Sequence, residues 1–202
     1  MIELSLEKTE KVREEIKNSL FTNVMMLGHC CLKSFPEQIF KQEYVVNLRR
    51  LDLSSNCIAV IPSSISVLIS LRELWLSNNP IEKFPSKIDQ LKKLELIDIS
   101  NTKISEVPTE LSLLEHLYDL DWRSTPLSTS LSRQHGVAEN DIFGLRKLLT
   151  DQHTRRTLET ELFDFLSGEH YLLDADRPGI KGDIKALVEV RIHMLCMWRC
   201  LV

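Results

Sequence analysis

Apolar residues recur along the middle of this chain with a fixed spacing. Three copies of one pattern begin at Leu48, Leu71 and Leu94, which are 23 residues apart. The middle copy reads LRELWLSNNPIEKFPSKIDQL: three leucines, then an asparagine, an isoleucine, a Phe-Pro pair and two further apolar residues. Weaker copies begin at Thr22 and Leu117, and three residues are inserted before Leu48. Such a pattern predicts one structural unit per copy.

A leucine code with a period in the twenties indicates leucine-rich repeats. The LxxLxL segment predicts a short strand whose leucines point inward. Asn56 and Asn79 can bond to backbone groups of the following turn, because an amide carries donors and an acceptor, whereas Thr102 and Thr125 can do this only in part. One repeat cannot bury its apolar face alone, so stacked copies share a core. We predict an α/β fold: a leucine-rich repeat solenoid with a parallel sheet on its concave face and helical caps at both ends.

The pattern divides the chain into three parts: an N-terminal capping helix over residues 1–21, about five repeats over residues 22–131, and a C-terminal helical region over residues 132–202. In the first part Val12, Ile16 and Leu20 recur at helical spacing between charged residues. We expect Ser5 to be the N-cap of this helix. Its apolar stripe would cover the open end of the first repeat, as terminal repeats require.

Beyond the repeats the pattern is less regular. The polar stretch 127–138 has no apolar period and predicts a loop. Helical spacing returns over residues 140–167, as one helix or as two, with Asn140 or Asp141 as the N-cap. A last helix is expected over residues 183–201, and its apolar tail would pack either on the repeats or on a partner.

Three copies end in a segment with proline at its second position: IPSSI, FPSKI and VPTEL, at residues 61–65, 84–88 and 107–111. With these segments the chain resembles the intracellular 23-residue LPxxIxxL class, which includes the plant intracellular Ras-group-related leucine-rich repeat proteins and their animal scaffold relatives. The resemblance covers roughly half of the chain. It implies a binding scaffold inside a larger assembly and does not identify the partner.

Composition narrows the class of partner and the compartment. The net charge of −4 gives no general footprint for nucleic acid or membrane. The N-terminal residues lack the basic and apolar regions of a signal peptide. Five scattered cysteines, an odd number, do not form the paired framework of secreted repeat proteins. We therefore expect a reducing, cytoplasmic location, with cytoskeletal or ciliary structures as a second option.

Enzyme, metal and cofactor motifs are missing from the sequence. It contains no glycine-rich phosphate loop, no HExxH and no nucleophile elbow. Cys196 and Cys200 stand one helical turn apart near His193, but structural zinc needs four ligands, so we interpret them as free thiols. Asp174 and Asp176 resemble the start of a calcium loop that lacks its later oxygen ligands. We predict a non-enzymatic protein with no catalytic residue, no cofactor and no metal.

The strand template indicates which residues point away from the core and are candidates for binding a protein partner. They flank the inward leucines of successive repeats: Met26, Arg50, Asp52, Glu73, Trp75, Asp98, Asp119, Asp121 and Arg123. An exposed tryptophan at the centre of such a row is typical of an interface anchor. The carboxylates around it favour a partner with a basic surface. The simpler interpretation is that aspartates are tolerated at these positions and that Trp75 lies flat on its neighbours.

A second functional hypothesis belongs to a different class. The chain would be a structural subunit built permanently into a large assembly, such as a ciliary, axonemal or cytoskeletal complex. The apolar stretch 194–202 favours this hypothesis, because the C-terminal helices would then dock on the assembly.

Overall fold

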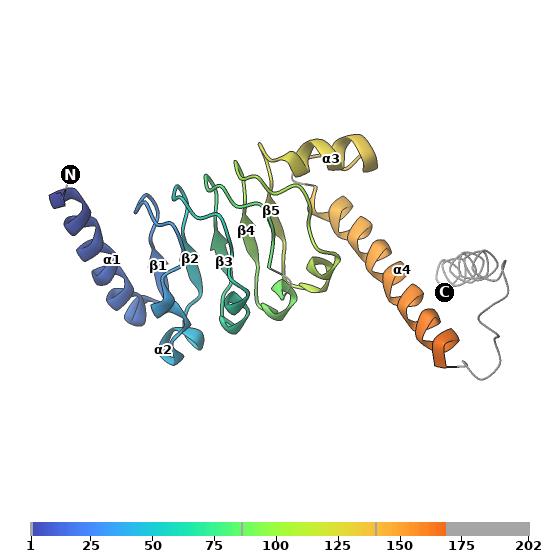
Figure 1. Ribbon diagram of the computed structural model, residues 1–202, viewed down its shortest axis with the longest axis horizontal. Coiled ribbons are helices and arrows are strands. Elements are labelled where there is room, and N and C mark those ends of the chain that lie inside the picture. The colour runs from blue at the N-terminus through green and yellow to red at the C-terminus, as the bar shows by residue number, and fades with distance from the viewer. Residues whose placement is uncertain (1, 86, 140, 169–202) are drawn as a thin grey trace. The chain divides into compact units, whose positions relative to one another are not determined.

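The computed structural model describes residues 2–85, 87–139 and 141–168, and it divides into two compact units between Thr150 and Asp151. The first unit carries one five-stranded sheet in which each strand pairs in parallel with the next along the chain (Figure 1). Its strands are β1 (Val24–Met26), β2 (Arg50–Asp52), β3 (Glu73–Trp75), β4 (Leu96–Asp98) and β5 (Asp119–Asp121). The predicted α/β leucine-rich repeat solenoid is therefore confirmed, with one short parallel strand per repeat.

The core lies between the sheet and a layer of short helices. The middle residue of every strand is at most 1% exposed; these residues are Met25, Leu51, Leu74, Ile97 and Leu120. Opposite them lie four 3-10 helices, η1 (Glu37–Phe40), η2 (Ser63–Val67), η3 (Ile88–Gln90) and η4 (Thr109–Leu113). Pro36, Pro62 and Pro108 stand directly before three of these helices, where a fixed φ directs the chain into the turn.

Buried asparagines connect neighbouring repeats, as the sequence predicts. Asn79 Nδ2 donates to the carbonyl oxygens of Leu53 and Leu76, and its Oδ1 accepts from the amide of Ile58. Asn56 makes the same set of bonds one repeat earlier. Thr102 makes only one such bond, from Oγ1 to the carbonyl of Ile99. Because a threonine hydroxyl has a single donor, the later repeats lose part of this link.

A left-handed residue stands at the same position of every repeat, one residue before the asparagine position. These residues have φ between 52° and 59°: His29, Ser55, Asn78, Asn101 and Ser124. Asparagine tolerates this conformation better than most residues, and Asn101 Nδ2 also donates to Asn78 Oδ1 at 2.7 Å. The turn after each strand therefore forms without glycine.

The N-terminal helix α1 (Ile2–Thr22) covers the first strand. It begins before Ser5, so the predicted N-cap at Ser5 is wrong. Ile16 and Ser19 are buried, whereas Leu20 is 37% exposed, because the helix turns Ser19 towards the core in its place. Glu15 Oε1 accepts from the amide of Met26 and so satisfies a donor at the free edge of β1.

The short helix α2 (Gln42–Val45) lies directly before the position where the first repeat is longer than the others. Its Tyr44 is 5% exposed and belongs to the core. Burial, followed by the nearby charge of Glu43, raises the pKa of the Tyr44 phenol. The inserted residues are therefore accommodated as a helical turn that adds an aromatic ring to the core.

The predicted loop at residues 127–138 is wrong, because most of it belongs to the helix α3 (Pro126–His135). Thr125 is its N-cap and accepts from the amide of Ser128 through Oγ1 at 3.2 Å. Pro126 occupies the first helical turn, and Gly136 ends the helix with φ of 65°. Leu127 and Leu131 are buried, so α3 takes the place of the missing second half of the fifth repeat.

The segment predicted as one helix or two is a single helix, α4 (Ile142–Gly168). Asp141 caps it, since its Oδ1 accepts from the amide of Gly144 at 2.9 Å. Within the first unit, Leu145 and Leu149 are buried and Arg146 Nη2 donates to the carbonyls of Leu114 and Leu117. The first turns of α4 thus close the last repeat.

Several sequence expectations lie outside the described residues: the helix at 183–201, the Asp174 and Asp176 loop, and the Cys196, Cys200 and His193 group. No helix in the described ranges combines the length and apolar character that a membrane span needs.

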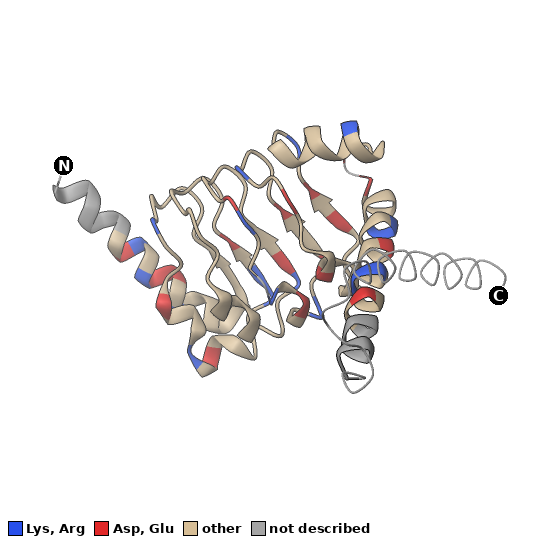
Figure 2. Ribbon diagram, turned by 45° about the vertical axis from the view of Figure 1, so that its right-hand side comes forward, with Lys and Arg blue, Asp and Glu red and all other residues tan. Residues whose placement is uncertain are grey.

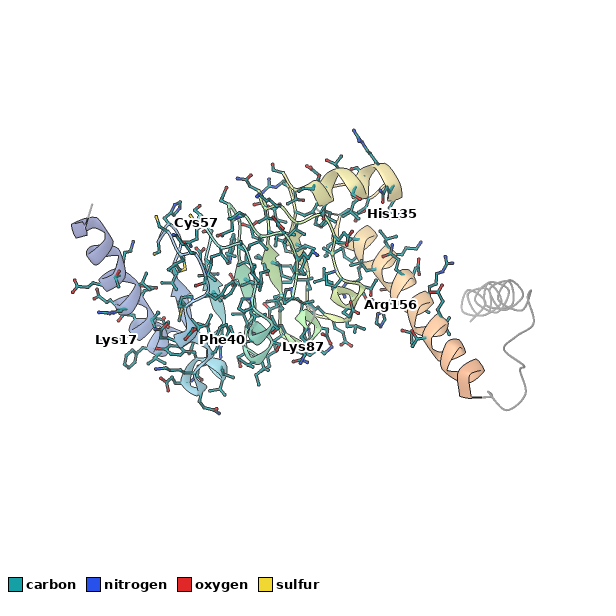
Figure 3. The ribbon with its side chains drawn as sticks, in the orientation of Figure 1. Lys17, Phe40, Cys57, Lys87, His135 and Arg156 are labelled. Atoms are coloured by element: carbon teal, nitrogen blue, oxygen red, sulfur yellow. The ribbon has the colours of Figure 1, made fainter. Side chains whose placement is uncertain are left out.

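The core register predicts that Leu74→Ala is among the most damaging single changes. Leu74 is fully buried at the centre of the middle strand, and such a truncation should lower the free energy of unfolding by about 2–5 kcal/mol. Urea denaturation measures the loss. Lys87→Ala is the control, because Lys87 stands directly before η3 with an exposed side chain (Figure 3). Equal losses in the two variants would contradict the register.

The bonds of Asn56 and Asn79 between neighbouring repeats predict that Thr102→Asn stabilises the protein. The new amide should donate to the carbonyl of Leu76 and accept from the amide of Ile81, as Asn79 does one repeat earlier. Such a gain is worth about 1 kcal/mol. Lys103→Asn places the same residue at the neighbouring exposed position and should leave thermal stability nearly unchanged. A lower melting temperature for Thr102→Asn would refute this role.

Candidate protein-binding surface

One face of the sheet, which we call the open face, carries the side chains that alternate with the buried strand centres. In register, its first row is Met26, Asp52, Trp75, Asp98 and Asp121. Its second row is Val24, Arg50, Glu73, Leu96 and Asp119. Figure 2 shows acidic residues on neighbouring strands of this sheet. The structure therefore brings the candidate residues together, and Arg123 lies two residues after the end of β5.

The candidates differ in exposure. Met26 is 45% exposed, and Asp119 and Arg123 are also exposed. Trp75 is half-buried rather than fully exposed, and Asp98 is only 8% exposed. The expectation of a freely exposed tryptophan is corrected, because Trp75 lies between the strand neighbours Asp52 and Asp98. The neighbours on both sides leave only part of the Trp75 side chain available to a partner.

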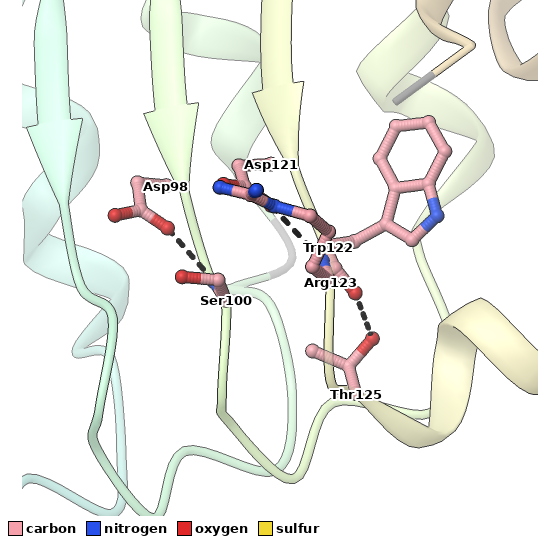
Figure 4. A network of polar contacts seen from close by, with 6 residues as sticks. All are labelled: Asp98, Ser100, Asp121, Trp122, Arg123 and Thr125. Carbon is pink, nitrogen blue, oxygen red and sulfur yellow. Dashed lines mark hydrogen bonds and ion pairs between the residues drawn. The ribbon is translucent and has the colours of Figure 1, made fainter. Parts of the chain in front are cut away.

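Three aspartates of the first row have a structural function that the sequence analysis missed. Asp52, Asp98 and Asp121 each use Oδ1 to accept the amide of the residue two positions later, at 2.8, 2.9 and 3.0 Å. Figure 4 shows two of these bonds, from Ser100 and Arg123. Each carboxylate holds the end of its strand in an Asx turn. An aspartate repeated directly after the buried strand centre is the signal that could have revealed this function.

Two ion pairs lie on the open face. Arg50 Nη2 contacts Glu73 Oε2 across neighbouring strands at 2.6 Å, and Arg123 Nη2 contacts Asp121 Oδ2 at 2.6 Å. The hydrogen bond from Arg50 lowers the pKa of Glu73 against the opposing effect of burial. Burial would raise the pKa of Asp121, but the side-chain and backbone hydrogen bonds of Arg123 outweigh it and lower this pKa. Register at one repeat spacing could have predicted the first pair.

The two ion pairs determine which carboxylates of the open face keep a negative charge that no arginine neutralises. Five carboxylates and two guanidinium groups leave a formal charge of −3 among the nine candidates. Glu73 and Asp121 have arginine partners, so the three carboxylates without an ion pair in the described residues are Asp52, Asp98 and Asp119. The remaining negative charge therefore lies beside Trp75 and towards β5.

The described residues show neither a metal site nor a pocket for a substrate. Among the described residues, no three His, Cys, Asp or Glu side chains gather in a way that could hold a metal ion. A cavity of about 10 Å³ lies between η4 and α4, lined by Leu111, Ser112, Leu117, Ile142, Leu145, Arg146 and Leu149. It holds about one water molecule, so it is too small for a substrate.

Comparison with known proteins identifies the repeats. Residues 46–92 and 69–116 match the family model described as "Leucine Rich repeats (2 copies)". The chain therefore contains leucine-rich repeats, and proteins of this kind generally mediate protein–protein interactions without enzymatic activity. No curated protein matches the chain.

Solved structures with similar repeats come from bacteria and plants. A leucine-rich repeat protein of Leptospira interrogans is 26% identical, with 55% of this chain and 34% of that chain covered and a TM-score of 0.44. The BIR3–SERK2 complex of Arabidopsis thaliana contains a chain with 33% identity, coverage of 46% and 50%, and a TM-score of 0.41. The BIR2 ectodomain of the same plant is 22% identical, with coverage of 50% and 66% and a TM-score of 0.43. The chain spans less than two thirds of each of these proteins.

The Arg50–Glu73 pair predicts a pH-dependent contribution to stability. Because the pKa of Glu73 is lowered from its ordinary value of 4.5, the contribution is present at neutral pH and is lost as pH falls through the lowered pKa. Arg50→Met should therefore lower the urea midpoint at pH 7 and have a smaller effect near pH 3. The pair is partly exposed, so the difference is small. A loss that stays constant at both pH values would contradict this role.

Proposed function

We propose that this protein is a non-enzymatic interaction scaffold that binds a protein partner through the open face of its sheet, as one component of a larger complex. The observation that carries the proposal is the arrangement around Trp75. A half-buried aromatic ring shares a sheet face with three carboxylates that have no ion pair among the described residues, and the 3-10 helices leave this face uncovered. Partly desolvated aromatic groups are typical anchors of protein interfaces.

Charge supports a partner with a basic surface. The open face has a formal charge of −3, and complementary charge speeds association and excludes acidic partners. Its two arginines, Arg50 and Arg123, form ion pairs with Glu73 and Asp121, so they do not make a basic patch of the kind that binds nucleic acid or anionic lipid. Its aspartates are held by their own turns, which reduces the entropy that binding would cost.

We infer a reducing, cytoplasmic location from the cysteines. In the described residues Cys30, Cys31 and Cys57 are thiols, and Cys30 is buried at the position that asparagine occupies in the next repeats. A cytoskeletal or ciliary location remains the second option. The alternative function as a permanently built-in structural subunit depends on residues 183–202, which lie outside the described residues.

Site-specific photo-crosslinking tests which face binds. Benzoylphenylalanine replaces Met26 on the open face in one variant and Lys87 beside η3 in the other, each in the full chain. We expect a partner to be captured from position 26 and not from position 87. Strong capture only from position 87 would move the function to the other face of the repeats.

The captured partner then serves in quantitative binding. Trp75→Ala should weaken its affinity about 30-fold, because removing a central anchor costs about 2 kcal/mol. Asp119→Lys should mainly slow association at low salt, since Asp119 is exposed and has no ion pair in the described part of the chain. Lys87→Ala is the matched control, and circular dichroism checks that all variants are folded. Unchanged affinity in both open-face variants would refute the proposal.

A further inference from the structure

We propose that Trp75, Asp52 and Asp98 form a subsite for a single arginine side chain of the partner protein. This inference rests on the proposed function and specifies which chemical group of the partner reaches the centre of the open face. The guanidinium would lie flat on the indole ring and donate one hydrogen bond to the carboxylate on each side.

The three side chains of the proposed subsite lie next to one another in the sheet. The register pairs Trp75 with Asp52 on β2 and with Asp98 on β4, so the ring lies between two carboxylates in one row. In the part of the chain that the structure describes, three carboxylates of this face have no ion pair, and two of them are thus the immediate neighbours of the aromatic ring. A cation above the indole would gain from the ring and from both carboxylates.

Hydrogen bonds within the protein orient these three side chains before a ligand arrives. Asp52 Oδ1 accepts from Ser54, and Asp98 Oδ1 accepts from Ser100. Among the described residues no hydrogen bond reaches Oδ2 of either carboxylate. Asp52 is half-buried and Asp98 is 8% exposed, so an arginine would have to reach down to these oxygens between the strands. Trp75 Nε1 donates to Glu73 Oε2 at 3.3 Å, which fixes the orientation of the ring by its edge.

The spacing distinguishes arginine from lysine. Neighbouring strands lie about 4.8 Å apart, so the backbones that carry Asp52 and Asp98 are separated by about 9.6 Å. A flat guanidinium has donors on opposite edges and reaches outwards through charge-assisted bonds of about 2.8 Å. A lysine ammonium is a compact charge without this width, so it can satisfy only one of the two carboxylates at a time. Each carboxylate offers one oxygen, which matches one N–H on each side.

The surroundings agree with one cation at this place. Arg50 and Arg123 form their ion pairs with Glu73 and Asp121. They also attract Asp52 and Asp98 through the longer-range effect of charge, without an ion pair among the described residues. Asp119, the third carboxylate without an ion pair, lies in the other row, opposite Leu96. It adds to the general negative field, but it does not flank the ring.

Two peptides of equal length and charge, tetra-arginine and tetra-lysine, test the subsite on the full chain. Binding to every variant is measured by the fluorescence anisotropy of dye-labelled peptides. In the unmodified chain, the NMR shift of the Trp75 indole N–H, which the Trp75→Phe spectrum assigns, shows that the peptide reaches the ring. We expect tetra-arginine to bind about fivefold more tightly than tetra-lysine. Trp75→Leu should remove the preference while weaker binding of both peptides remains. Thermal melts confirm that this variant is folded, and Trp75→Phe, which keeps a smaller ring, should retain part of the preference.

Neutral variants of the three carboxylates provide matched controls. Asp52→Asn and Asp98→Asn keep the oxygen that holds the turn and remove the charge, so each should reduce the preference for arginine. Asp119→Asn removes the same charge outside the subsite and should weaken both peptides equally.

Three results would overturn the subsite. Equal affinity for both peptides, or an equal loss of preference in all three Asn variants, would show that only the general field attracts cations; the scaffold function would then stand. Failure of both peptides to bind also overturns it, and photo-crosslinking with the protein partner decides separately whether the open face binds.

Discussion

The structure depends on the fact that no repeat can bury its own apolar residues. The strand centres, such as Leu51 and Leu74, are fully buried because the next repeat stacks against them. The hydrogen bonds of the buried Asn56 and Asn79 fix the distance and register of this stacking. Each of Asn56 and Asn79 bonds to its own strand and to the strand before it. The regular placement of every outward side chain follows from that register.

Stacking creates a problem at both ends, because a terminal repeat has no neighbour on one side. The chain solves it differently at each end. At the first strand, α1 supplies Ile16 to the core and the Glu15 carboxylate to the backbone of Met26. At the last repeat, α3 and the start of α4 supply apolar residues, and Arg146 donates to the carbonyl groups of Leu114 and Leu117. A guanidinium suits this position because it presents several donors in a fixed plane.

The open face combines structural and functional demands in the same residues. Asp52 and Asp98 hold the ends of their strands with one carboxylate oxygen, and the other oxygen contributes to the charge of the surface. This double use explains why aspartate recurs at this template position better than simple tolerance of a soluble residue does. It also means that charge reversal at Asp98 disturbs the turn, so Asn is the more informative substitution there.

The sequence by itself determined the repeat register, the five parallel strands, the buried core and the residues that share the open face. It did so because the 23-residue period and the alternation within each strand are local properties of the chain. Only the tertiary structure decided how deeply Trp75 and Asp98 are buried, since their neighbours come from strands one period away. It also decided that Leu20 faces solvent and that residues 126–135 form a helix. That helix has a polar sequence without an apolar period. It is stabilised by the packing of its two buried leucines on the last repeat.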